Sequence, residues 1–282
     1  MATASKIRAS FRQLHESGCF VIPNPWDAGS TRYLQHLGFP ALATTSSGAA
    51  FALGKPDDDL AVPRDVMLAH VASIVEAAGI PVNADFKSGY ARAPEGVAAN
   101  VRLCIETGVA GLSIEDSTED PAAPLFELSL AVERIRAARE AIDASGTGVL
   151  LTARAECFLT GTPEPLSDAL RRLSAYAEAG ADVLYAPGPR TRGEIRAIVE
   201  AVHPKPVNAL VLAGTGLSVS DFAELGVRRI SVGSALARCA WGGFARAARE
   251  IASAGTFTAF DMAEPFAALN QFFRESNNSD IL

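Results

Sequence analysis

The sequence predicts an α/β protein whose single domain is a (β/α)8 barrel, also called a TIM barrel, and three observations support this. First, eight short apolar runs, rich in residues that favour β-strands, recur along the chain. Second, polar loops and segments with helical spacing separate these runs, as expected for parallel βα units. Third, the length of 282 residues suits such a barrel, which usually needs about 250.

The eight expected strands are short runs rich in Val, Ile, Leu and Ala. They cover residues 20–24, 41–46, 81–85, 111–116, 149–154, 183–187, 206–211 and 229–233. Apolar residues at helical spacing between the runs predict helices, of which the clearest are 64–78, 95–107, 130–144 and 166–179. Gly79, Gly108 and Gly180 follow three of these helices and suit a left-handed helix end.

We expect one domain over residues 1–282, because no Pro/Ser-rich linker and no change of composition divides the chain. From about residue 260 the chain is expected to continue as a helical extension of the barrel. An amphipathic helix is predicted at 264–273, followed by a polar end.

Composition and charge argue against several classes of function. The net charge of -7, from 25 basic and 32 acidic residues without long blocks of either sign, makes nucleic acid an unsuitable partner. No apolar run approaches the roughly 18 residues of a membrane helix. Residues 1–12 lack the apolar core of a secretory signal, so we expect a cytoplasmic protein without membrane contact. The four cysteines lie far apart and fit reduced, mostly buried thiols.

Polar residues are concentrated where the expected strands end, which is where a parallel barrel places its active site. They are Thr44, Thr45, Ser46, Ser47, Gly48, Asn83, Asp85, Glu115, Asp116, Arg154, Glu156 and Asn208. Each alone has a simpler explanation, because residues 44–48 could form only a turn and a lone Asp often caps the following helix. Together they would place several carboxylates and an arginine on one rim, where uncompensated charge is costly.

Such a rim suggests metal-assisted chemistry on a small acid. Mg2+ typically accepts one or two carboxylates together with water and substrate oxygens, and would offset the negative charge. Arg154 suits a substrate carboxylate, because its planar fork donates two parallel hydrogen bonds. Backbone amides of the small residues 44–48 could bind an oxyanion. A metal chelated by a 2-oxo acid would stabilise the enolate formed when a bond beside the carbonyl breaks.

At these residues the sequence resembles the isocitrate lyase and phosphoenolpyruvate mutase superfamily, over roughly residues 11–245. The resemblance rests on six segments: NPWDAGS (24–30), TTSSGAAFALGKPD (44–57), NADFKSGY (83–90), GLSIEDS (111–117), TARAECF (152–158) and ELGVRRISVG (224–233). Each segment is weak evidence alone. Their order and spacing make the match specific.

The resemblance implies roles for individual residues. Asp85 would bind Mg2+ or Mn2+ directly, and Glu115 would support the metal largely through bound water. Arg154 would hold the substrate carboxylate. The segment Thr45, Ser46 and Ser47 would match the oxyanion-binding loop of the superfamily, and Asp57 would match an acidic residue that faces the metal from the next loop.

The resemblance also bears on assembly. The superfamily resembles a helix-swapped barrel, in which the last helix packs on a neighbouring subunit. By this comparison the helix at 264–273 would be exchanged between protomers. A homodimer or homotetramer is the expected state.

Two departures from the superfamily pattern affect the function. The lyases that cleave isocitrate or methylisocitrate carry a KKCGH-type loop with an acid-base cysteine, whereas residues 117–128 read STEDPAAPLFEL, without Cys, Lys or His. The lysine and asparagine of the phosphonopyruvate-forming mutases are also missing there. In addition, Lys87 stands where relatives usually have an acidic residue that holds metal-bound water. It either pairs with Asp85 or Glu115 and weakens the metal, or points away from the site.

The leading hypothesis is a Mg2+-dependent carbon-carbon lyase, a decarboxylase of an oxaloacetate-like 2-oxo acid. Asn208 would contact the substrate, and water, Tyr90 or Tyr185 would protonate the enolate. Phosphonopyruvate hydrolase or mutase chemistry is the alternative within the enzyme class. A barrel that binds a 2-oxo acid without turnover is the alternative of another class. Gly233 and Ser234 could instead bind a phosphate, although a tight turn into a helix explains the same residues.

Overall fold

The computed structural model describes residues 3–58, 61–118 and 120–278. Glu119, which belongs to the loop at 117–128, and the last four residues of the polar end lie outside the described residues. The chain falls into two compact units, Ala2–Ser234 and Ala235–Leu282, and each is described by itself.

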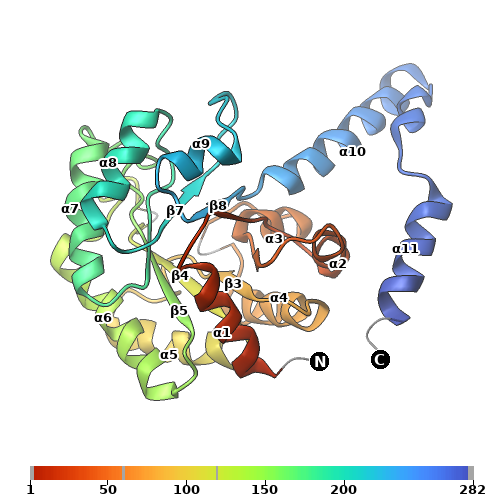
Figure 1. Ribbon diagram of the computed structural model, residues 1–282. Helices are drawn as coiled ribbons and strands as arrows, with labels where there is room; N and C mark the ends of the chain where they lie inside the picture. Colours follow the sequence, from red (N-terminus) through yellow and green to blue (C-terminus); the bar gives the residue numbers. More distant parts are fainter. Residues whose placement is uncertain (1–2, 59–60, 119, 279–282) are drawn as a thin grey trace. The chain divides into compact units, whose positions relative to one another are not determined.

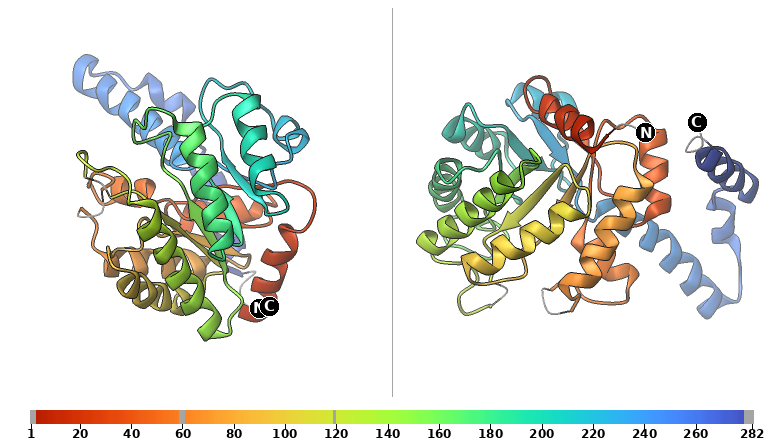
Figure 2. Two further views of the ribbon diagram at one scale, coloured as in Figure 1. Left: turned by 90° about the vertical axis from the view of Figure 1, so that its left-hand side faces the viewer. Right: turned by 90° about the horizontal axis from the view of Figure 1, so that it is seen from below.

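Eight parallel strands lie at the centre of the first unit and helices surround them (Figures 1 and 2). The strands are β1 (Phe20–Ile22), β2 (Leu42–Ala43), β3 (Val82–Asp85), β4 (Gly111–Glu115), β5 (Leu150–Arg154), β6 (Val183–Tyr185), β7 (Val207–Leu210) and β8 (Arg229–Ser231). Each strand lies within a run that the sequence assigns to a strand.

The sheet curls into a nearly closed barrel. Its strand order, β1-β8-β7-β6-β5-β4-β3-β2, leaves β1 and β2 at the two ends. The amide of Ala43, the last residue of β2, donates to the carbonyl of Pro23, just after β1, at 3.1 Å. This bond connects the end strands, and the predicted (β/α)8 fold class is confirmed.

Nine helices of the first unit are described. They are α1 (Ala4–Leu14), α2 (Ala28–His36), α3 (Ser46–Ala52), α4 (Arg64–Ala77), α5 (Pro94–Glu106), α6 (Leu128–Ser145), α7 (Pro165–Glu178), α8 (Arg192–Val202) and α9 (Val219–Glu224). The four clearest predicted helices are confirmed as α4 to α7. The left-handed ends are confirmed at Gly108 (φ 91°) and Gly180 (φ 102°). Gly79 was wrongly assigned, because α4 ends at Ala77 and the next residue, Ala78, already has an extended backbone (ψ 133°).

The N-terminal end of the barrel is closed by α1. Its Phe11 is fully buried against Phe20, Ala41, Ala110 and Leu150, which lie at or next to the starts of four strands. A larger apolar cluster fills the space between the strands and α4 to α8. With one end plugged and the flanks packed, the opposite end, where the strands finish, is the free face for a site.

The second unit contains α10 (Ala235–Ala254), a short 3-10 helix η1 (Thr258–Met262) and α11 (Phe266–Asn278). The helix predicted at 264–273 corresponds to α11, which begins two residues later and continues further. Several large apolar side chains of this unit are exposed: Trp241, Phe244, Phe257, Phe260, Met262 and Phe266. Among the helices described in either unit, none combines the length and the apolar character needed to cross a membrane.

Candidate active site

A polar cavity of about 360 Å³ lies at the C-terminal end of the barrel. The last residue of every one of the eight strands lines it, from Ile22 of β1 to Ser231 of β8. The charged lining residues are Asp57, Asp85, Lys87, Glu115, Arg154, Glu156 and Arg229. The structure therefore gathers the polar strand ends into one concave site, as is typical of barrel enzymes.

Asp85, at the end of β3, is fixed by the segment that follows β2. Its Oδ2 accepts a hydrogen bond from the amide of Ser46 at 2.9 Å, and its own amide donates to Thr44 Oγ1 at 2.9 Å. The Thr45 hydroxyl caps α3 by accepting from the amide of Gly48 at 3.2 Å. Residues 45–47 thus form the start of a short helix, and the Ser46 amide is bound to Asp85, so it is not open to a substrate oxyanion.

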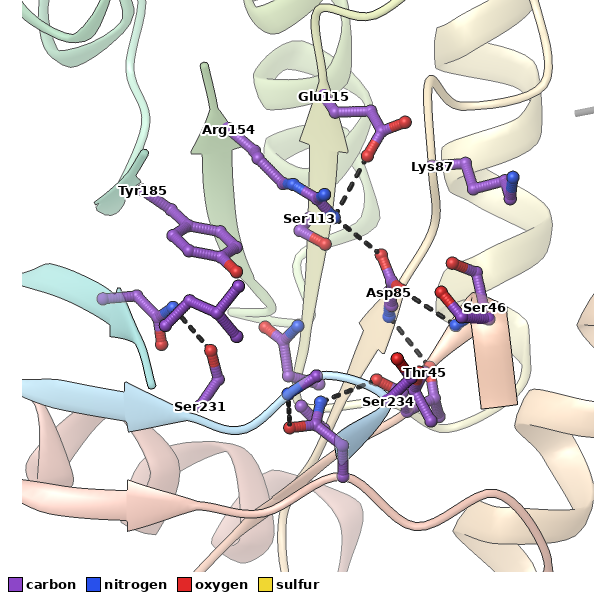
Figure 3. Close-up of a pocket in the computed structure, with 18 of the residues that line it drawn as sticks. Thr45, Ser46, Asp85, Lys87, Ser113, Glu115, Arg154, Tyr185, Ser231 and Ser234 are labelled. Carbon is purple, nitrogen blue, oxygen red and sulfur yellow. Dashed lines mark hydrogen bonds and ion pairs between the residues drawn. The ribbon is translucent and has the colours of Figure 1, made fainter. Parts of the chain in front are cut away.

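Arg154, at the end of β5, lies between three carboxylates. Its Nη1 is 3.1 Å from Glu115 Oε2 and 3.5 Å from Asp85 Oδ1 (Figure 3), and its Nε contacts Glu156. Burial alone would lower the pKa of this guanidinium, but Glu156 and Glu115 raise it well above its ordinary value. The ring of Tyr185, 5.4 Å from the guanidinium carbon, supports the same charge.

A buried network behind the cavity holds Glu156 and the loop after β4 in place. Asp116 accepts from the amide of Glu156 at 2.8 Å, from Tyr176 Oη at 2.5 Å and from Arg172 Nη1 at 3.1 Å. Arg172 also donates to the carbonyl of Phe126 at 2.9 Å. Burial raises the pKa of Asp116, although Tyr176 and Arg172 act in the opposite direction. The network positions the groups that contact Arg154.

Lys87 lines the cavity and its Nζ is 3.1 Å from Asp57 Oδ1. Ser47 also donates to Asp57. Of the two orientations that the sequence leaves open, the structure shows the inward one, with Asp57 as the ion-pair partner. Neighbouring residues of a strand would point to opposite sides, but Lys87 lies in a turn after β3: its backbone is left-handed (φ 47°), and Phe86 before it is fully buried in the core.

The structure brings most of the other candidate residues to the cavity, but not Gly48, Asp116 or Tyr90. Thr45, Ser46, Ser47, Asn208 and Tyr185 line it. Tyr90 does not, because its ring packs on Phe86 at 5.2 Å among core side chains. Burial raises the pKa of Tyr185 to about 12, so this phenol stays protonated at neutral pH.

Several lining residues were not singled out by sequence reasoning: Asn24, Ser113, Arg229 and Ser231. Asn24 ties the strand ends together, because its Oδ1 accepts from the amides of Val232 and Gly233 at 3.0 and 2.9 Å. The Gly233 amide is therefore already bonded within the protein. The sequence did offer one sign of Arg229 as a cavity residue, because it is a charged residue at the start of the otherwise uncharged run RISVG.

The donor set fits a hard divalent cation. Asp85 and Glu115 approach the same Arg154 nitrogen from opposite sides, and every candidate ligand in the cavity is an oxygen. Throughout the described ranges, no group of three or more His, Cys, Asp or Glu side chains is placed to hold a metal by itself. This agrees with Mg2+, which commonly takes one or two carboxylates and completes its shell with water and substrate.

A barrel with carboxylates and a buried arginine at its C-terminal mouth is typical of enzymes with the (β/α)8 fold. The family model for phosphoenolpyruvate phosphomutase matches residues 11–252. The chain therefore belongs to this family, within the isocitrate lyase and phosphoenolpyruvate mutase superfamily of lyases and mutases, as its motifs predict.

Individual relatives support the assignment. The chain is 31% identical to 2,3-dimethylmalate lyase of Eubacterium barkeri, with 72% of this chain and 69% of the relative covered. It is 31% identical to oxaloacetate decarboxylase of Rhodopseudomonas palustris, with 77% and 73% covered. A crystal structure from Burkholderia cenocepacia, described as a lyase/mutase, is 47% identical with a TM-score of 0.91, and 96% of each chain is covered.

Proposed function

We propose that the protein is a Mg2+-dependent carbon-carbon lyase that decarboxylates an oxaloacetate-like 2-oxo acid. The observation that carries the proposal is the convergence of Asp85, Glu115 and Arg154 at the end of three adjacent strands. Two carboxylates suit a divalent cation, and the guanidinium beside them suits the carboxylate of the substrate. The similarity to an oxaloacetate decarboxylase supports this choice of substrate class.

Asp85 and Glu115 would hold the metal. When bound, Mg2+ would act as a Lewis acid that stabilises negative charge on the 2-oxo group. Arg154 would orient the substrate through its carboxylate, and Glu156 would keep the guanidinium in that position. The amide of Ser46 restricts Asp85 to one orientation, so that Asp85 needs little rearrangement to serve as a ligand.

Proton delivery would come from the cavity side of the site. Tyr185 lines the cavity beside Arg154 and its phenol is protonated at neutral pH, although its pKa, raised by burial to about 12, makes it a weaker acid than an ordinary tyrosine. Water in the cavity would be the second source. The absence of Cys, Lys and His from residues 117–128 argues against the acid-base loop of the isocitrate-type lyases and favours decarboxylation, which needs no such group.

A coupled assay of product release tests the proposal. The enzyme with Mg2+ would be given oxaloacetate, 2-oxoglutarate and phosphonopyruvate in parallel, with pyruvate and inorganic phosphate both measured. We expect pyruvate and CO2 from oxaloacetate without phosphate release from phosphonopyruvate. Phosphate release as the fastest reaction would assign phosphorus-carbon chemistry, and binding of all three without any product would assign a non-catalytic barrel.

A further inference from the structure

Arg229 is a buried cation inside the barrel whose charge has no carboxylate partner among the described residues. It begins β8, is 3% exposed and lines the cavity. The other cations of the cavity have such partners: Lys87 pairs with Asp57, and Arg154 pairs with Asp85, Glu115 and Glu156. The positive charge at Arg229 is therefore the one in this cavity that the described carboxylates do not balance.

The contacts of Arg229 are all with neutral groups. Its Nε donates to Asn208 Oδ1 at 2.8 Å and its Nη2 to Thr152 Oγ1 at 3.0 Å. Its Nη1 lies 3.4 Å from His15 Nε2. His15 Nδ1 is 2.8 Å from the carbonyl oxygen of Phe11. A carbonyl oxygen can only accept, so Nδ1 carries the proton of the neutral ring. Nε2 is therefore the acceptor for the Arg229 N–H.

None of the three partners of Arg229 supplies a compensating negative charge. Asn208 and Thr152 are neutral side chains, and His15 is uncharged as well. Burial, with a contribution from Arg229, lowers the pKa of His15 to about 3, so the ring is neutral at pH 7. Burial also lowers the pKa of Arg229, but only to about 10, so the guanidinium remains charged. An uncompensated ion in a protein interior is energetically costly, so a bound anion would stabilise the fold here.

The guanidinium still has donors to offer. It carries five N–H groups, and the three contacts use one on each nitrogen. One N–H on each terminal nitrogen therefore remains for a ligand. The wall of the same cavity carries small polar side chains, among them Ser231 and Ser113, in place of the bulky branched side chains that usually fill a barrel.

We propose that Arg229 is an anion-binding group deep in the cavity, and that it takes a small monovalent anionic group such as a halide or a carboxylate. The site lies on β8 and β7 with Thr152 of β5, apart from Asp85 and Glu115, and does not depend on the proposed decarboxylation. Two sources of the anion share this chemistry: a free small anion and the second carboxylate of a dicarboxylic 2-oxo acid.

The first experiment measures the melting temperature of the metal-free protein at fixed ionic strength while sodium chloride, bromide or formate replaces sodium gluconate, whose bulkier anion serves as the reference. Binding to the folded state raises its stability by mass action. We expect the wild-type melting temperature to rise by about 2–4 °C, and Arg229→Met to lose this rise. Arg228→Met is the matched control. Arg228 directly precedes β8, does not line the cavity, and donates to the carbonyl of Gly18.

Two further measurements identify the source and guard against a variant that does not fold. In gluconate, pyruvate and 2-oxoglutarate are compared as stabilising ligands. If the second carboxylate occupies the site, Arg229→Met reduces only the effect of 2-oxoglutarate. Crystals of the wild type soaked in bromide should show an anomalous peak beside Arg229. The proposal is overturned if no anion stabilises the wild type, if Arg229→Met responds equally, or if bromide is absent there at stabilising concentrations.

Discussion

At the scale of single residues, the proposed function depends most on Arg154. We predict that Arg154→Lys lowers kcat/KM by about 10²-fold, because an ammonium cannot present two parallel donors to a carboxylate while also contacting Glu115 and Glu156. The measurement is steady-state decarboxylation together with circular dichroism. Arg171→Lys serves as the control, since that side chain is 63% exposed on α7. Unchanged kinetics in Arg154→Lys would remove this residue from the site.

Lys87 stands where the resemblance to the superfamily implies an acidic residue. Its ammonium lines the cavity and opposes a cation there, so Lys87→Glu should lower the Mg2+ concentration for half-maximal activity by about tenfold. The midpoints are compared at fixed ionic strength, with Lys55→Glu as a control for an exposed lysine of the same region. Equal midpoints would mean that the ion pair with Asp57 already cancels the charge of Lys87.

Local patterns predicted the identity of the site residues better than their orientation. Asp85, Glu115 and Arg154 could be selected because each ends an apolar strand, and parallel strands share one face. The exclusion of Tyr90 could not be predicted, and the inward position of Lys87, the orientation that we favoured, does not follow from strand alternation, because both residues adopt positive φ values (54° and 47°) in a turn. Strand alternation does not apply in such a turn, and bulky residues reach it only when the surrounding structure holds them.

At the scale of elements, α1 makes the barrel floor sensitive to pH. The pKa of His15, at the end of α1, is lowered by burial and by Arg229 to about 3, against an ordinary value of 6.5. A lowered folded-state pKa means that the stability is complete above pH 6.5 and is lost as the pH falls towards 3. At pH 5 the loss from this group is roughly 2 kcal/mol.

We therefore expect His15→Gln to unfold in urea at midpoints that change less between pH 7.5 and pH 5 than those of the wild type. His36→Gln is the control, because that histidine is exposed in the last turn of α2. The contradicting result is an equal change of the urea midpoint in the wild type and in His15→Gln between these pH values. It would show that the barrel floor does not hold His15 neutral.

The elements themselves were largely predictable, with physical reasons for the exceptions. Eight apolar runs gave eight strands because burial on both faces requires continuous apolar sequence. The strands are shorter than the runs, since residues at one or both ends of each run belong to the adjoining loops. The short α3 was missed because TTSSG has the composition of a turn, and its helix depends on the Thr45 cap.

At the scale of the whole molecule, the second unit suggests assembly. We propose that its exposed aromatic side chains, among them Phe257, Phe260 and Phe266, pack on a second copy of the chain in a homodimer or homotetramer. Light scattering on the purified protein should give at least twice the mass of 29.5 kDa. Phe266→Glu should shift this mass towards the monomer, with the exposed Arg274→Glu as control. A wild type that remains monomeric at micromolar concentration would contradict the proposal.

The interior of the barrel could not be derived from local sequence. Arg229 meets Thr152, Asn208 and His15 only because four separate segments close around one axis. The pattern of a single strand gives no information on such contacts. The same closure places Asp85, Glu115 and Arg154 around one point, so the catalytic proposal depends on the whole fold.

The most direct test of the central proposal is pyruvate release from oxaloacetate by enzyme stripped of metal, with Mg2+ then returned. Spontaneous decarboxylation by Mg2+ without enzyme is subtracted. The metal-free enzyme should be inactive and Mg2+ should restore turnover in the wild type. Asp85→Asn should stay inactive at the same Mg2+ concentration, because it lacks the carboxylate that would bind the cation. Turnover by the metal-free enzyme, or equal restoration in Asp85→Asn, would contradict a metal-assisted reaction at this site.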